Sequence, residues 1–106
     1  MRLPPDTTIA ADKLTMYLLA HRTRNDKSRW LAQAGYSLRN WQQLERDLRQ
    51  QILPREAELD ETNQYGHVYR IKAELVGPNG IVLRAITIWM TEHETGQTKL
   101  ITMYPQ

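Results

Sequence analysis

The 106-residue chain contains no cysteine. That absence excludes disulfide bridges, thiolate metal sites and a cysteine nucleophile, and it fits a reducing compartment. Only three histidines occur, His21, His67 and His93, and none is spaced from another ligand as metal sites require. No apolar run approaches the roughly 20 residues that span a bilayer, and residues 1–8 lack the apolar core of a signal peptide. We therefore expect no metal, no membrane segment and a cytoplasmic location.

Several motifs that would indicate an enzyme class are also missing. The chain has no glycine-rich phosphate loop, because Gly77-Pro78-Asn79-Gly80 is typical of a plain turn. So few histidines give no Ser/His/Asp arrangement that can be identified from the sequence. Glu74 is the only acid among the candidate site residues on the predicted strands, so the paired carboxylates of a glycosidase are not indicated. The sequence predicts no cofactor.

Size and composition indicate one globular domain over residues 1–106. Apolar residues make up 41% and charged residues 25% of the chain, which is typical of a globular protein with one core. A length of 106 residues is too short for two domains. The net charge of +2 is unevenly distributed, because residues 1–55 carry +5 and residues 56–106 carry −3. The densest basic stretch covers residues 21–29. Such a stretch attracts phosphate, although a solvated connection between helices is the commoner explanation.

Residues 12–53 have the apolar spacing of three helices. Asp12 is a suitable N-cap for a first helix from Lys13 to about Ala20. A second helix is predicted from Asn25 or Asp26 to Gly35, where glycine suits a left-handed C-cap. Ser37 precedes the third and strongest helix, at residues 38–53, whose apolar residues recur every three or four positions up to Pro54. The acidic residues 56–61 have no period and are predicted to be a loop.

Residues 64–105 alternate between apolar and polar side chains and predict an antiparallel meander of three to four strands. A four-residue loop at Gly77–Gly80 would place Leu75 opposite Val82 and Tyr69 opposite Ile88. The next hairpin would place Met90 opposite Ile101, with Glu92 and Lys99 as an opposite-charge pair. A three-residue loop with a bulge at Gly80 is the competing register, because the preferred one leaves Arg84 on the apolar side.

Helices followed by antiparallel strands predict an α+β fold with the helices packed on one face of the sheet. In this register one face is aliphatic and packs on the helices. The other face has no cover left in so short a chain, and it collects charged, hydroxyl-bearing and aromatic residues: Arg70, Lys72, Glu74, Thr87, Trp89, Thr102 and Tyr104. We expect this polar-aromatic face to be the functional site.

Metal-free cleavage of RNA is one chemistry that this residue set suits. It requires a base for the 2′-hydroxyl, a proton donor for the leaving oxygen, and cations or hydroxyls around the phosphate. Candidate catalytic residues are Lys13, His67, Arg70, Thr87, Thr102 and Tyr104, and candidate substrate-binding residues are Lys27, Lys72 and Trp89. Each also has a structural explanation, since strand lysines aid solubility, threonine favours strands and His67 lies on the packed side in this register.

The chain resembles a family of uncharacterised small bacterial domains that is common in cyanobacteria. The resemblance rests on a set of motifs along nearly the whole chain: Lys13-Leu14-x-x-Tyr17-Leu18-Leu19, Lys27, Trp30, Gly35-Tyr36, Asn40-Trp41-x-x-Leu44-x-x-Asp47-Leu48-Arg49, Tyr65-Gly66-x-x-Tyr69, Gly77-Pro78-Asn79-Gly80, Thr87-x-Trp89 and Thr102-x-Tyr104-Pro105. A common family form has Arg after the Gly-Pro-Asn-Gly turn, whereas this chain has Ile81. Similar domains resemble toxin-like ribonucleases of the barnase, colicin D and RelE type.

Two functions follow as hypotheses. The resemblance implies a small metal-independent ribonuclease toxin that acts on RNA and is covered by a small acidic antitoxin or immunity-like protein. The alternative is a non-catalytic interaction module that binds a protein partner through the same polar-aromatic face.

Overall fold

The computed structural model describes residues 1–24 and 26–106, so the predicted helix start at Asn25 lies outside the described residues. The helical elements come first in the chain. They are η1 (Lys13–Leu18), α1 (Ser28–Ala32), η2 (Leu38–Asn40), α2 (Trp41–Asp47) and η3 (Leu48–Ile52). The strands follow as β1 (Glu58–Thr62), β2 (Gly66–Val76), β3 (Val82–Glu92) and β4 (Thr98–Pro105). The predicted α+β order is confirmed.

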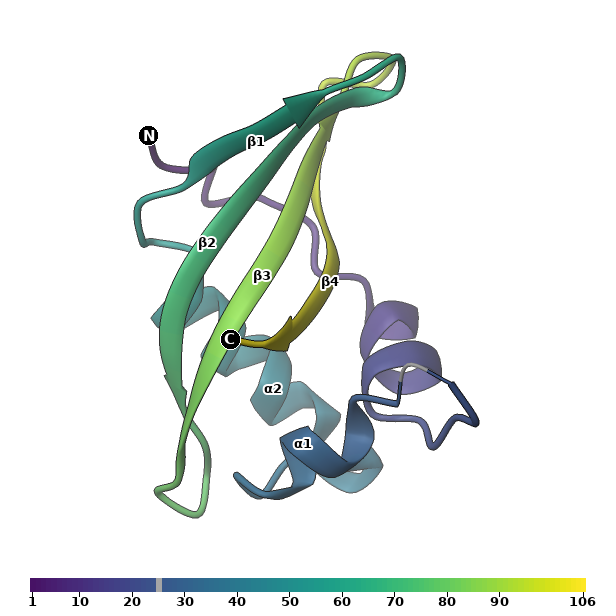
Figure 1. The fold of residues 1–106 in the computed structure, drawn as a ribbon, viewed down its shortest axis with the longest axis vertical. Helices are drawn as coiled ribbons and strands as arrows, with labels where there is room; N and C mark the ends of the chain where they lie inside the picture. The colour runs from purple at the N-terminus through teal and green to yellow at the C-terminus, as the bar shows by residue number, and fades with distance from the viewer. Residues whose placement is uncertain (25) are drawn as a thin grey trace.

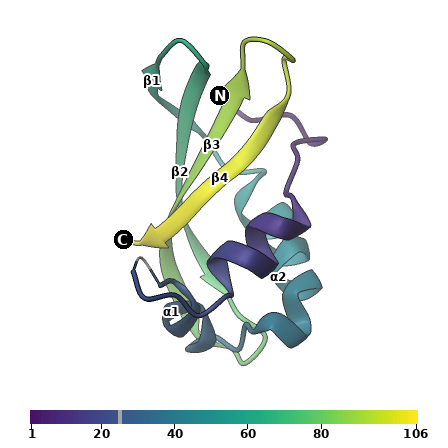
Figure 2. The same cartoon turned by 90° about the vertical axis from the view of Figure 1, so that its right-hand side faces the viewer.

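The four strands form one antiparallel sheet in the order β1-β2-β3-β4, which is a simple meander. The helical elements lie on one side of this sheet, as Figures 1 and 2 show from two directions. The first strand corrects the sequence prediction, which had placed a loop at residues 56–61. All five residues of β1 are exposed and a bulge lies between Leu59 and Glu61, so the strand lacks the apolar alternation by which strands are recognised.

The prediction of three helices is only partly matched. η2, α2 and η3 follow one another without a break over the predicted third helix, and their buried side chains include Leu44, Leu48 and Ile52. The first two helical elements are much shorter than predicted, with six residues in η1 and five in α1. Short elements of this kind are held by packing rather than by their own stability.

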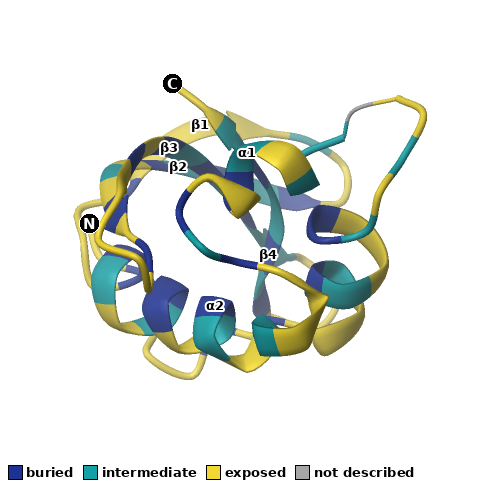
Figure 3. Ribbon diagram, turned by 90° about the horizontal axis from the view of Figure 1, so that it is seen from below, coloured by how far each residue is buried: buried dark blue, intermediate teal, exposed yellow. Residues whose placement is uncertain are grey.

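The N-terminal segment completes the cover of the packed face. Leu3 and Ile9 are buried in the same core as the helices. The backbone N–H of Thr8 donates to Thr98 O at 2.8 Å and the N–H of Leu100 donates to Thr8 O at 2.9 Å, so residue 8 pairs with the outer edge of β4. Seen along the sheet from below, buried residues line the interior and exposed residues form the outside (Figure 3).

The register of β2 and β3 differs by one residue from the prediction. Val76 pairs with Val82 and Leu75 with Leu83, so five residues, 77–81, connect the strands instead of four. A Cβ on Gly77 would lie 2.1 Å from Ala34 O, so the loop packs directly against the backbone that follows α1. Because side chains alternate along a strand, a one-residue shift turns every side chain of β3 to the other face.

A β-bulge also changes the phase of β4. Ile88 pairs with Thr102 and Trp89 with Leu100, so Ile101 is the extra residue. Leu100 and Met103 are therefore both buried, although three positions separate them. The predicted pairing of Met90 with Ile101 is wrong, since Met90 faces Lys99. The predicted ion pair is nevertheless present, with Lys99 Nζ 3.3 Å from Glu92 Oε2.

Candidate functional site on the open sheet face

The outward face of the sheet is a series of cross-strand rows that we call the open face. In antiparallel strands, directly paired residues lie on the same face, so the register defines each row. From the β2–β3 turn upward, the rows are Val76–Val82, Glu74–Arg84, Lys72–Ile86–Tyr104, Arg70–Ile88–Thr102 and Val68–Met90–Lys99. No described helix lies over this side of the sheet in Figures 1 and 2.

Apolar side chains occupy the centre of the open face. Ile86, Ile88 and Met90 follow one another at every second position of β3 and are half-buried by their neighbours. Val82 is 47% exposed and its partner Val76 is 46% exposed at the end of the hairpin. The polar side chains of β2 and β4 lie on both sides of this stripe, which makes the open face apolar at its centre and charged at its margins.

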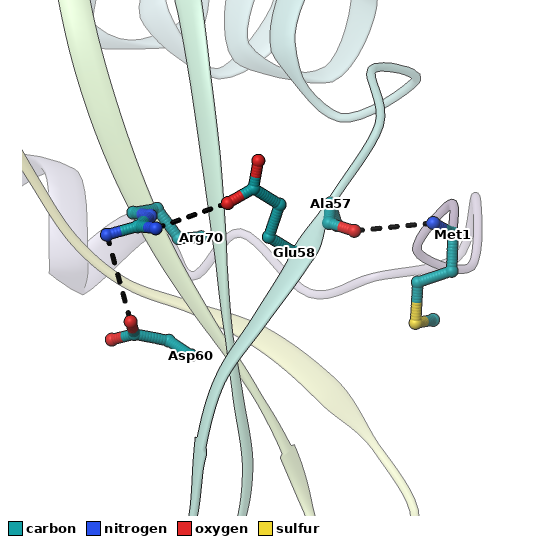
Figure 4. Close-up of polar contacts among 5 residues, drawn as sticks. All are labelled: Met1, Ala57, Glu58, Asp60 and Arg70. Atoms are coloured by element: carbon teal, nitrogen blue, oxygen red, sulfur yellow. Dashed lines mark hydrogen bonds and ion pairs between the residues drawn. The ribbon is translucent and has the colours of Figure 1, made fainter.

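Four of the nine predicted site residues share this face: Arg70, Lys72, Thr102 and Tyr104. Arg70, however, is engaged by acids of the edge strand. Its Nη2 lies 3.1 Å from Glu58 Oε2, and its Nη1 lies 3.8 Å from Asp60 Oδ1 (Figure 4). Within the described part of the chain its Nε is buried without a hydrogen-bond partner. Two carboxylates therefore balance the guanidinium charge before any phosphate arrives.

Thr87 and Trp89 are not on the open face, which corrects the sequence prediction. Both side chains are fully buried beneath the helices. The indole Nε1–H of Trp89 donates to Thr87 Oγ1 at 2.8 Å, and the Thr87 hydroxyl donates to Ile71 O at 3.0 Å. This chain of hydrogen bonds satisfies the polar atoms internally, so an indole and a hydroxyl can occupy the core in place of the aliphatic Ile86 and Ile88.

The other three predicted residues lie away from Arg70. His67 pairs with Thr91 on the opposite face, where its Nδ1 is 2.8 Å from Thr62 Oγ1 and its ring meets the edge of His93 at 5.0 Å between centroids. Lys13 is in η1, and Lys27 directly precedes α1. The structure does not bring the six predicted catalytic residues together.

Lys13 belongs instead to a cluster of cations around Tyr17. Its Nζ lies 4.8 Å from the centroid of the Tyr17 ring, and Arg22 Cζ lies 4.0 Å from the same ring. A hydrogen bond from Arg22, followed by the charge of that guanidinium, lowers the pKa of Tyr17 below its ordinary value. Cation–π contacts of this kind hold a guanidinium flat over a ring and restrict its motion.

A buried polar pair escaped the sequence analysis. The Tyr36 hydroxyl donates to Asp47 Oδ2 at 2.6 Å, and Gln43 Nε2 donates to Asp47 Oδ1 at 2.8 Å. Burial, the hydrogen bond to Asp47 and the charge of that carboxylate raise the pKa of Tyr36 well above its ordinary value of 10.0. The signal was present in part, because Asp47 interrupts the buried side of the third predicted helix between Leu44 and Leu48. Only the fold places Tyr36 opposite it.

Residues 1–24 and 26–106 contain no group of three or more His, Cys, Asp or Glu side chains that could hold a metal ion. Within the same residues, no helix has both the length and the apolar character needed to cross a bilayer.

These features define the class of protein: an α+β domain in which helices and an N-terminal segment cover one face of a four-stranded antiparallel meander and leave the other open. Comparison with known families then places it. Residues 5–106 match the family described as Domain of unknown function (DUF6883), and the chain belongs to that family. No curated protein and no solved structure gives a significant match. Membership of an uncharacterised family is thus confirmed, whereas the match lends no support to the resemblance to ribonuclease toxins.

Proposed function

We propose that this domain is a non-catalytic protein-interaction module and that the open face is its docking surface. The observation that carries the proposal is the stripe of Ile86, Ile88 and Met90 on the outward side of a central strand. With the four-residue loop predicted from the sequence, this strand would turn Thr87 and Trp89 outward. In the structure it turns the aliphatic side chains outward instead. Apolar residues gathered on an uncovered face, with a charged margin, are typical of surfaces that bind another protein.

The margin of the open face indicates how such a partner would be oriented. β1 contributes the acids Glu58, Asp60 and Glu61 on one side, and Lys99 lies on β4 at the other. A partner that inserts apolar side chains over Ile88 would therefore meet negative charge along one margin. Charge of this kind sets orientation and association rate more than affinity. The exposed acids and the bulge of β1 also disfavour strand addition at that edge, so contact through the face is favoured over contact through the edge.

A photo-crosslinking experiment tests this function in the native host. Benzoylphenylalanine at Tyr104 lies beside the apolar stripe, since Tyr104 pairs with Ile86. The matched control is the same substitution at Tyr65, a tyrosine that is 66% exposed in the turn between β1 and β2. We expect a discrete adduct from position 104 that Ile88→Lys removes, and none from position 65.

Equal crosslinking from both positions would contradict the proposal, as would an adduct from position 104 that persists in the Ile88→Lys variant. Ile88 is half-buried on the outward face, so the lysine stem can stay on the sheet while its charge reaches solvent. An unchanged circular dichroism spectrum and melting temperature would establish that the variant is folded.

A metal-independent ribonuclease is a second candidate, favoured by one observation. Lys72 and Tyr104 lie in one row of the open face, next to the row of Arg70 and Thr102, so a cation, a phenol and a hydroxyl are neighbours. On this candidate, expression alone would arrest growth and purified protein would cleave total RNA. Replacing Arg70 and Thr102 with alanine would relieve both effects. Intact RNA and normal growth with the wild-type protein would exclude the ribonuclease candidate. The acidic antitoxin expected for such a toxin would then have no role.

A further inference from the structure

The helical part of the molecule holds a second surface whose charge is strongly one-sided. Residues 13–44 contain six lysines and arginines but a single acid, Asp26, so this stretch carries +5 while the remainder carries −3. The cations are Lys13, Arg22, Arg24, Lys27, Arg29 and Arg39. The ion pairs found among the described residues involve none of these six side chains. This surface therefore differs from the open face, where Arg70 is already balanced by two acids.

A groove with an apolar floor lies within this basic surface. Its volume is about 460 Å³, and its lining comes from the end of η1, from α1 and from η2. Its apolar lining residues are Leu19, Ala32, Tyr36 and Leu38. Leu19 and Tyr36 are buried, whereas Ala32 is exposed and the large apolar side chain of Leu38 is 50% exposed. The rest of the lining is polar or basic and comprises His21, Ser28, Arg29, Ser37 and Arg39.

A second hollow continues the groove toward the cation cluster. It shares His21 and Arg29 with the first and adds Arg22, Thr23 and Asp26. Asp26 forms no ion pair with an arginine among the described residues, since its Oδ1 accepts from the Ser28 N–H at 2.8 Å and its Oδ2 lies 3.1 Å from His21 Nδ1. Arg22 is held against Tyr17 and is thereby pre-positioned. Cations thus line both hollows, with Arg29 and Arg39 in the first and Arg22 and Arg29 in the second.

We propose that this groove binds single-stranded nucleic acid. A single strand carries both phosphates and flat apolar bases, and the groove combines cations with apolar side chains. One base would lie over the exposed Leu38 and Ala32, with phosphates of the strand at Arg39, Arg29 and Arg22. Stacking and apolar contact with a base combined with a cationic track along the backbone is how proteins bind single strands without sequence preference. The site is separate from the open face and does not depend on the proposed docking function.

Binding of a labelled single-stranded oligouridylate, followed by fluorescence anisotropy, tests this proposal. We expect wild-type affinity to fall with salt at a slope of about −2 in log–log form, since three phosphate contacts each contribute roughly −0.7. The double variant Arg29→Gln/Arg39→Gln should bind at least about tenfold more weakly and lose roughly 1.4 of that slope. Leu38→Asp should weaken binding while its effect on the slope stays smaller than that of the double variant.

The matched control is Arg46→Gln/Arg55→Gln, which removes the same charge from exposed arginines outside the groove. This control should retain affinity within about threefold of wild type. An equal loss in both double variants would show general electrostatic attraction and overturn the site, as would absent binding at low salt. Equal competition by polyglutamate would instead identify an acidic peptide as the ligand and also overturn the proposal. Ile88→Lys should leave binding intact, so failure of the docking function and failure of this site are distinguishable.

Discussion

Replacing Trp89 with alanine is expected to lower the free energy of unfolding by about 3–5 kcal/mol, measured by urea denaturation. Trp89 is fully buried and is the largest such side chain in the core, so its removal leaves a cavity beneath the helices. It also removes the donor to Thr87 Oγ1. A cost below about 1 kcal/mol, typical of surface positions, would contradict the burial of this face of β3.

Milder variants keep this prediction measurable if the alanine variant does not fold, because a domain of this size has only about 5–15 kcal/mol of stability in total. Trp89→Phe preserves most of the apolar contact but removes the Nε1–H donor. Thr87→Val preserves shape but leaves that donor without its acceptor, which costs about 1–3 kcal/mol. The matched control is Thr102→Val, because Thr102 lies on the open face, and it should change stability by no more than about 0.5 kcal/mol.

Stability should also fall steeply at alkaline pH because of Tyr36. The fold raises the pKa of Tyr36 above its ordinary value of 10.0, so the hydroxyl keeps its proton in the folded state and loses it in the unfolded state. The stabilising contribution is complete below pH 10.0 and is lost as pH rises from there toward the folded-state pKa. Over that window the slope of unfolding free energy should be about −1.4 kcal/mol per pH unit from this one group.

Tyr36→Phe isolates the contribution of that hydroxyl. At neutral pH the variant leaves the buried Asp47 carboxylate with the Gln43 amide as its remaining partner and should lose about 1–3 kcal/mol of stability. Above pH 10.0 its stability should decline less steeply than that of wild type, since the other titrating groups are common to both proteins. Parallel pH profiles for the two proteins would show that Tyr36 is not protected from ionisation by the fold. Tyr65→Phe, at an exposed tyrosine, should leave the profile unchanged.

Six of the nine predicted site residues lie on the two proposed surfaces. Lys13 and Lys27 belong to the basic helical surface, whereas Arg70, Lys72, Thr102 and Tyr104 lie on the open face. The sequence analysis assigned all of them to one ribonuclease site, because a sequence does not give the distances between residues of different helices and strands. The structure instead separates these residues onto two surfaces. We propose that one contacts a protein and the other a phosphate-bearing strand, and the experiments above test each independently.

The sequence by itself determined the order of elements, the long helical stretch up to Pro54, the meander and the outward direction of β2, where apolar Ile71 and Leu75 alternate with Arg70, Lys72 and Glu74. Only the tertiary structure decided which face of β3 is buried. Both faces of that strand are sufficiently apolar, so local alternation does not distinguish them. The choice depends on the close contact of Gly77 with Ala34 and on the hydrogen bonds that allow Trp89 and Thr87 into the core, which are contacts between residues distant in the chain.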